Sequence, residues 1–87
     1  MTVPDRDEGA LPEHDLLLDE RGRLCPLPII ALARAFAADP APAHVLLLSD
    51  DPAAGTDVPA WCSLRGRVLL RTSPAPGGGT AFLVARD

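Results

Sequence analysis

The chain has 87 residues, of which 47% are hydrophobic and 3% aromatic, so it fits one small domain with a largely aliphatic core. Its formal net charge is −4 and every basic residue is an arginine. An acidic chain lacks the basic surface that nucleic-acid binding normally uses, whereas it suits docking to a basic protein. No apolar run is long enough to span a bilayer and no secretory signal is visible, so we expect a cytoplasmic protein without membrane contact.

Residues 1–13 are predicted to form a flexible N-terminal tail, because they are polar, charged and punctuated by two prolines and a glycine. The domain itself is expected to span residues 14–87. Its first strand should run from His14 to Leu18. Residues 19–24 then form a loop, in which Gly22 is available for a backbone angle that other residues avoid.

Residues 26–38 are expected to form the first helix. Their apolar side chains recur at the i, i+3, i+4, i+7 spacing of one buried stripe, which consists of Ile29, Leu32, Ala33 and Phe36. Arg34 lies away from that stripe. The helix should end at Asp39-Pro40, because the residue before a proline disfavours helical geometry.

The run Val45–Leu48 is continuously apolar, which is typical of an interior strand. A polar loop follows and leads to a second helix, predicted from Asp57 to about Leu64 with Thr56 as its N-cap. Gly66 is a natural end for this helix. The side chains expected on its buried face are Val58, Trp61 and Cys62.

Two closing strands are predicted at residues 68–71 and 81–85, joined by a mobile hairpin loop over residues 73–79, which contain two prolines and three glycines. The element order is therefore β-α-β-α-β-β. Placing both helices on one face of a sheet gives an α/β two-layer sandwich, which is the economical arrangement for these elements.

The sequence Cys25-Pro26-Leu27-Pro28 places a thiol at the entrance of the first helix. A helix N-terminus presents unpaired N–H groups and partial positive charge, and both favour a thiolate, the nucleophilic form of cysteine. Pro26 and Pro28 should stiffen the turn that aims the sulfur outward. Leu27 between them is either part of a docking surface or simply surface. No CxxC pair and no zinc-ligand spacing occurs, so we expect no metal and no cofactor.

The chain resembles the TusA/SirA family of small sulfur-carrier proteins over roughly residues 14–87. The motifs that carry the resemblance are Leu18-Asp19-x-x-Gly22, Cys25-Pro26-x-Pro28, Asp50-Asp51-Pro52 and Asp57-Val58-Pro59-x-Trp61-Cys62. The resemblance implies a two-layer sandwich with a mixed four-stranded sheet and two helices, in agreement with the element order above.

The resemblance also implies that Cys25 accepts a sulfur atom as a persulfide and passes it on, as a sulfurtransferase that acts as a carrier. Gly22, Pro26 and Pro28 would shape the site, and Arg21 and Arg23 could help to ionise the thiol. The family usually has Gly-Leu before the residue that precedes the cysteine, whereas this chain has Gly22-Arg23-Leu24. Either Arg23 replaces the apolar side chain, or the register slips and Leu24 takes its role.

The partners that the resemblance implies are a persulfide donor, such as a cysteine desulfurase or a rhodanese-like protein, and a downstream acceptor protein. The acceptor would serve tRNA thiolation, molybdenum-cofactor supply or sulfur oxidation. No direct nucleic-acid contact is expected, and the domain should be monomeric. Two other functions stay open: a non-catalytic regulatory or adaptor module, and a redox switch in which Cys25 pairs with Cys62.

Two groups of residues have both a structural and a functional interpretation. Cys62 is either a resolving thiol or a small apolar residue packed beside Trp61, and the second is favoured because unactivated cysteine behaves as a buried hydrophobe. Asp50, Asp51 and Asp57 are either an acid/base or metal cluster, or the polar residues of a turn and a helix cap. The turn and cap explain them more simply.

Overall fold

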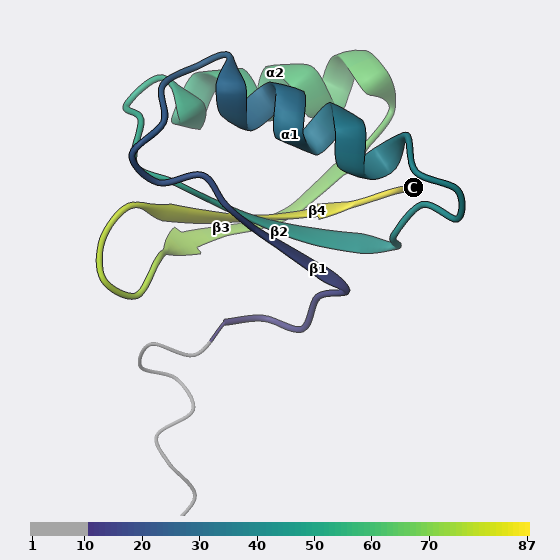
Figure 1. Ribbon diagram of the computed structural model, residues 1–87, viewed down its shortest axis with the longest axis horizontal. Helices are drawn as coiled ribbons and strands as arrows, with labels where there is room; N and C mark the ends of the chain where they lie inside the picture. The colour runs from purple at the N-terminus through teal and green to yellow at the C-terminus, as the bar shows by residue number, and fades with distance from the viewer. Residues whose placement is uncertain (1–10) are drawn as a thin grey trace, which may run out of the picture.

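A computed structural model describes residues 11–87 and shows six elements in the predicted order (Figure 1). The first ten residues of the predicted tail lie outside the described residues. The elements are β1 (Leu16–Asp19), α1 (Leu27–Phe36), β2 (His44–Ser49), α2 (Ala54–Arg65), β3 (Val68–Pro74) and β4 (Thr80–Ala85). Among residues 11–87, neither helix combines the length and the apolar character that crossing a membrane requires.

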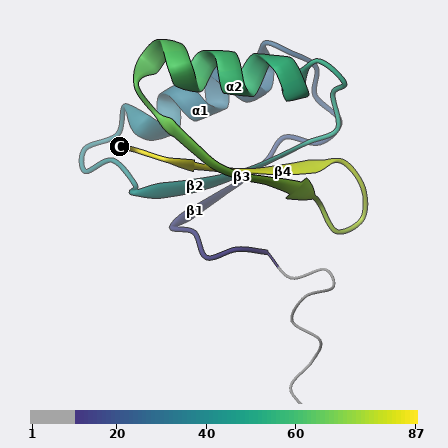
Figure 2. The same cartoon turned by 180° about the vertical axis from the view of Figure 1, so that it is seen from behind.

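The four strands form one mixed sheet in the order β1-β2-β4-β3. β1 pairs with β2 in parallel, with Leu16 opposite Val45, and β4 runs antiparallel to both β2 and β3. Both helices lie on the same face of this sheet, as Figures 1 and 2 show from opposite sides. The predicted two-layer sandwich is therefore confirmed.

The main core lies between the helices and the sheet. Side chains from α1, α2, β2 and β4 form one buried cluster, which comprises Leu32, Phe36, Val45, Leu47, Ala54, Val58, Cys62, Phe82 and Val84. The alternate residues of β2 and β4 point to the other face, where Leu46, Leu48 and Ala81 form a smaller cluster with Leu11 packed against it. β2 is thus apolar on both faces, which explains its unbroken apolar sequence.

The predicted apolar stripe of α1 is largely correct. Leu32 and Phe36 are buried and Ile29 packs against the core, but Ala33 is exposed, and Pro28 and Ala35 take part in its place. The helix is also shorter at both ends than the predicted 26–38. Pro26 lies directly before the first residue of α1. Two residues separate Phe36, the last residue of α1, from Asp39-Pro40, so the predicted end of the helix is close to the observed one.

The start of α2 differs from the prediction. The helix begins at Ala54 rather than Asp57, and its N-cap is Ala53 rather than Thr56. Asp51 holds the turn that precedes this start: its carboxylate accepts the Ala53 N–H at 2.9 Å, and its backbone carbonyl accepts the Ala54 N–H at 3.0 Å. Pro59 consequently lies inside the helix instead of in its first turn, while Gly66 ends it in a left-handed conformation as expected.

The closing hairpin is longer than predicted, because β3 continues to Pro74 and pairs there with Thr80. Its loop, residues 75–79, is also tied down rather than free. The Ala75 N–H donates to the Gly79 carbonyl at 2.9 Å, and the Ala75 side chain is buried under the sheet. The predicted mobility of this loop stays a prediction, and these contacts show that the loop has a defined conformation in the structure.

Candidate functional site

The loops that follow the two parallel strands lie at one end of the sheet. Because β1 and β2 run in the same direction, their carboxyl ends meet at the same edge. The loop after β1 carries Cys25 and the loop after β2 carries Asp50 and Asp51. The topology therefore brings together residues that are about 25 positions apart in the chain, and the β3–β4 loop reaches the same end (Figure 1).

Two consecutive carboxylates hold the backbone of the cysteine loop. Asp50 Oδ1 accepts the Gly22 N–H at 3.0 Å, and Asp51 Oδ2 accepts the Cys25 N–H at 2.6 Å. The other oxygen of Asp51 accepts the Ala53 N–H at the start of α2, so one side chain links the cysteine loop to both the loop after β2 and the second helix. Gly22 has a φ of 85°, in the left-handed region, which confirms the predicted need for glycine there.

The first turn of α1 offers fewer N–H donors than a helix N-terminus usually does. Pro26 and Pro28 have none, and the Leu27 N–H donates to the Leu24 carbonyl at 3.0 Å. Pro28 is buried beneath the turn and Cys25 is half-buried at its rim. The prolines shape the turn as expected, yet they also remove the donors that would favour a thiolate.

The electrostatic environment of Cys25 is the opposite of the expected one. Burial raises the pKa of its thiol to about 12, with further contributions from hydrogen bonding of the thiol to Asp57 and then to Asp51, and from the negative charge of both carboxylates. The N–H groups of Ala53 and Cys25 lower the pKa of Asp51, so that side chain is charged at neutral pH. The free thiol of Cys25 is therefore protonated at neutral pH.

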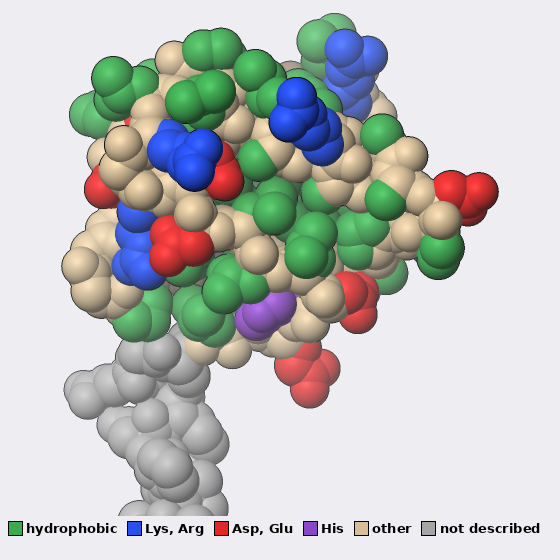
Figure 3. All heavy atoms as spheres, in the orientation of Figure 1, with side chains coloured by type: hydrophobic (Ala, Val, Ile, Leu, Met, Phe, Trp, Pro, Cys, Tyr) green, Lys and Arg blue, Asp and Glu red, His purple; other side chains and the backbone are tan. Residues whose placement is uncertain are grey.

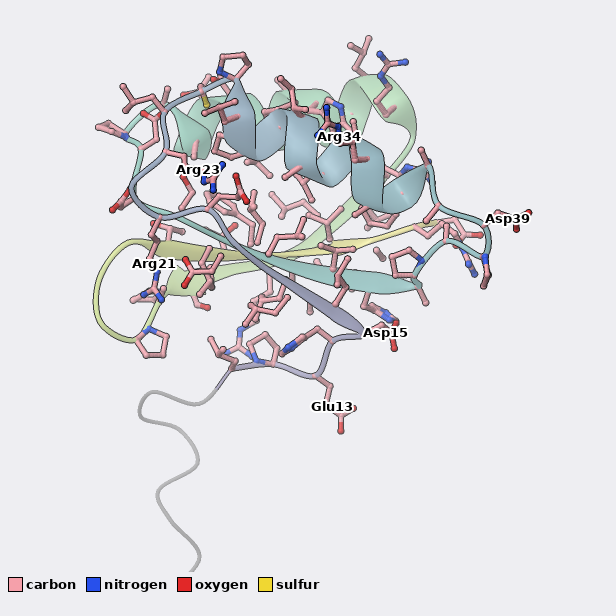
Figure 4. The ribbon with its side chains drawn as sticks, in the orientation of Figure 1. Glu13, Asp15, Arg21, Arg23, Arg34 and Asp39 are labelled. Atoms are coloured by element: carbon pink, nitrogen blue, oxygen red, sulfur yellow. The ribbon has the colours of Figure 1, made fainter. Side chains whose placement is uncertain are left out.

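Arg21 does not donate to the thiol. Its guanidinium binds Asp19 in a bidentate contact at 2.8 and 2.9 Å and donates to the carbonyls of Pro76 and Gly78 at 2.6 and 3.3 Å. Figure 4 shows the side chain beside the β3–β4 loop. The expectation that Arg21 favours ionisation of Cys25 has no support in these contacts, and its observed role is to tie the hairpin loop to the end of β1.

The unusual Arg23-Leu24 order leaves both side chains exposed. Arg23 lies 3.8 Å from Glu20, and Leu24 is 69% exposed. Leu24 therefore has no buried role, and both side chains lie on the surface. Arg23 occupies the surface beside the cysteine turn, and no hydrogen bond joins it to Cys25 among residues 11–87.

Cys62 belongs to the core and not to the exposed site. It is 2% exposed, packs with Val58 between α2 and the sheet, and burial raises its pKa. The favoured structural interpretation of Cys62 is confirmed. Trp61 likewise packs against the core, with its ring stacked on Phe36 at a centroid distance of 6.2 Å. Both cysteines are free thiols in the structure.

The aspartates have the predicted turn role, but among the described residues no side chain caps α2, and the aspartates also act on Cys25. Asp51 accepts the Cys25 N–H, and hydrogen bonding to Asp57 and Asp51 raises the pKa of the Cys25 thiol. The signal that could have found them is topological, since two parallel strands followed by loops must place those loops together. Within residues 11–87, no group of three or more His, Cys, Asp or Glu is arranged to hold a metal ion.

One comparison with known proteins bears on this site. The sequence model of the family described as "Sulfurtransferase TusA" matches residues 17–86 of the chain. The matched stretch begins in β1 and ends after β4, so it contains every helix and nearly every strand residue of the described structure, together with the cysteine turn.

Proposed function

The chain belongs to the TusA sulfurtransferase family, and from this premise we propose that it is a sulfur carrier whose Cys25 holds the transferred atom as a persulfide. The single observation that supports this choice of residue is the position of Cys25. It lies at the rim of a turn that two carboxylates and two prolines hold in place, whereas Cys62 is enclosed in the core.

The proposed reaction is thiol exchange. The Cys25 thiolate attacks the outer sulfur of a donor's cysteine persulfide, and a new sulfur–sulfur bond forms at Cys25 while the donor's bond breaks. The donor's cysteine leaves as a thiolate and takes up a proton, and the proton lost by Cys25 goes to a nearby carboxylate or to water. No net oxidation occurs. In the next step an acceptor thiol attacks the terminal sulfur carried on Cys25.

The carboxylates at the site imply that this reaction depends on docking. With Asp51 and Asp57 beside it, the free thiol stays protonated at neutral pH and reacts slowly with small electrophiles. A partner that brings positive charge against these carboxylates would lower the pKa of the thiol and so increase the fraction of thiolate. The carrier would then be reactive mainly when a suitable protein is bound, which suits a monomer that docks transiently.

Gly22, Pro26 and Pro28 serve this function by fixing the turn, and Arg21 serves it by holding the hairpin loop next to it. The donor is proposed to be a cysteine desulfurase, with a rhodanese-like protein as the other possible source. The acceptor would belong to tRNA thiolation, molybdenum-cofactor supply or sulfur oxidation, and each of these requires a protein that receives sulfur from a small carrier.

The test is to incubate the protein with a cysteine desulfurase and cysteine, and to measure the intact mass without reductant. The native protein and Cys62→Ser should gain the mass of one sulfur atom, and Cys25→Ser should not. A folded Cys25→Ser protein that still gains sulfur would contradict the assignment. A native protein that gains none, yet still binds the desulfurase, would favour a regulatory or adaptor module.

A further inference from the structure

A groove lies between α1 and β1, along the edge of the sheet that β1 forms. β1 is an edge strand, since it pairs only with β2 in the sheet. The groove has a volume of about 400 Å³, and the side chains that define it are Leu16, Leu18, Arg23, Leu27, Ile30 and Arg34. Ala31, Ala35 and Glu20 also line it, so apolar side chains outnumber charged ones in the groove.

A second row of α1 side chains, distinct from the row that faces the core, lines this groove. Leu27, Ile30, Ala31 and Arg34 follow one another at the i, i+3, i+4, i+7 spacing, next to the stripe that faces the core. Three apolar side chains along the groove remain well exposed, with 45% for Leu27, 39% for Ile30 and 37% for Leu16. These side chains line one groove together instead of being scattered singly, so the stripe is a candidate contact surface.

The charge of the groove is opposite to that of the chain. Three charged residues line the groove: Arg23 and Arg34 are basic, and Glu20 is acidic. The Glu20 side chain is largely buried and lies 3.8 Å from Arg23. Arg34 forms no ion pair among residues 11–87. Figure 4 shows Arg23 and Arg34 on the side of the molecule that faces the viewer, and Figure 3 shows the hydrophobic surface between the two basic side chains in the same view.

We propose that this groove receives an apolar segment with acidic side chains from the protein that donates sulfur to Cys25. The proposal rests on the proposed function, and it adds which surface recognises the donor and with what chemistry. Complementary charge speeds encounter and fixes orientation, while the exposed leucine and isoleucine side chains provide the apolar contact.

The position of the groove relative to the sulfur supports this occupant. Leu27 lines the groove and is only two residues from Cys25, so a segment bound there brings its own protein against the cysteine turn. The donor would contact two surfaces of opposite charge. Its acidic segment faces Arg23 and Arg34, and its basic groups face Asp51 and Asp57 beside the thiol. This arrangement defines one orientation in which sulfur can be transferred.

The experiment compares sulfur loading from a cysteine desulfurase, with cysteine as substrate, in matched variants. Arg34→Glu is paired with Arg65→Glu, which makes the same charge change on an exposed residue of α2. Ile30→Ala is paired with Leu64→Ala, which removes an exposed apolar side chain from α2. Each variant is also loaded with inorganic polysulfide, which reaches Cys25 without a protein partner.

We expect Arg34→Glu and Ile30→Ala to lower kcat/KM for loading from the desulfurase roughly tenfold, mainly through KM, because rim charges and apolar anchors act on encounter and binding. The control variants on α2, Arg65→Glu and Leu64→Ala, should have the same kcat/KM as the native protein. All variants should load equally from polysulfide. Equal kinetics for Arg34→Glu and Arg65→Glu would overturn the proposed surface.

The other outcomes separate this inference from the proposed function. A native protein that accepts sulfur from polysulfide but not from the desulfurase would overturn the donor and, with it, the groove, while the sulfur-carrying thiol would stand. A native protein that accepts sulfur from neither source would overturn the proposed function itself. A loss of polysulfide loading in Arg34→Glu would show that the residue supports the turn, and would also contradict the docking role.

Discussion

The backbone N–H of Cys25 donates a 2.6 Å hydrogen bond to Asp51 Oδ2, which joins the turn after β1 to the start of α2. The same carboxylate accepts the Ala53 N–H, so its loss would leave two backbone donors without their partner. The Asp51 carboxylate therefore stabilises the cysteine turn and the start of α2 together.

Asp51→Ala is therefore expected to lower the free energy of unfolding, because two backbone donors lose a charged acceptor. Urea unfolding followed by circular dichroism measures this change. Asp39→Ala is the matched control, because Asp39 is exposed beyond the end of α1, far from the turn (Figure 4). Equal midpoints for the two variants would show that the Asp51 contacts contribute nothing to the stability of the domain.

The pH dependence of alkylation tests the charge state of the thiol. Because the folded protein raises the pKa of Cys25 to about 12, the thiolate is the minor form throughout the neutral range. The rate of modification by iodoacetamide should rise about tenfold per pH unit from pH 7 to 10 without a plateau, whereas an ordinary thiol levels off above pH 9. Peptide mapping separates Cys25 from Cys62.

Asp57→Asn should make Cys25 react faster at pH 8, since it removes one negative charge and weakens an acceptor that favours the neutral thiol. Asp39→Asn should leave the rate unchanged. A native protein whose alkylation rate is already level at pH 8 would contradict the proposed protonated resting state, and with it the idea that docking activates the thiol.

The two cysteines should not form a bridge in the native protein. Cys62 is 2% exposed within the core cluster, so its sulfur would have to leave the interior to reach Cys25. Mild oxidation with diamide, followed by non-reducing mass analysis, should give mixed or intermolecular disulfides through Cys25 and no intramolecular bond. Rapid and quantitative intramolecular bonding under native conditions would instead favour the redox switch.

Gly79 is predicted to be the most sensitive position of the hairpin loop. A Cβ there would lie 2.7 Å from the carbonyl oxygen of Ser49, directly before the carboxylates of the site, whereas a Cβ at Gly78 would meet nothing within 4 Å. Both glycines have positive φ values, so both alanine variants carry backbone strain. Comparing them separates that strain from the steric contact.

Gly79→Ala should lower the thermal midpoint more than Gly78→Ala, by the equivalent of about 1–3 kcal/mol, because the contact is with backbone that cannot rotate away. It should also slow loading of Cys25 by polysulfide, since Ser49 leads into the Asp50–Asp51 segment. Identical behaviour of the two variants would show that the loop does not support the site.

The element order and the layer arrangement could be predicted because they follow from local patterns. The apolar runs of β2 and β4, the helical spacing of α1 and the punctuation by Gly66 and Asp39-Pro40 each depend on nearby residues only. Boundaries were less accurate where tertiary contacts decide them. α2 begins three residues earlier than predicted, after a turn that the Asp51 carboxylate holds, and pairing with Thr80 extends β3 to Pro74.

The sequence nominates Cys25 as the candidate sulfur residue, which stays a prediction, but it does not reveal the electrostatic environment of the thiol. A thiol before a helix suggests activation when only the helix is considered. Pro26 and Pro28, already visible in the sequence, remove N–H donors from that turn, and the structure adds two carboxylates from other elements that favour the neutral thiol. Arg21, which the sequence places near the sulfur, is occupied by Asp19 and by carbonyls more than 50 residues away.

The central claim is that Cys25 carries a labile sulfur atom. Its most direct test is fragment mass spectrometry of the native protein after loading by a cysteine desulfurase with cysteine. The added sulfur should be found on the peptide that contains Cys25 and should be released by a dithiol. An added sulfur on Cys62 alone, or one that a dithiol does not release, would contradict the claim.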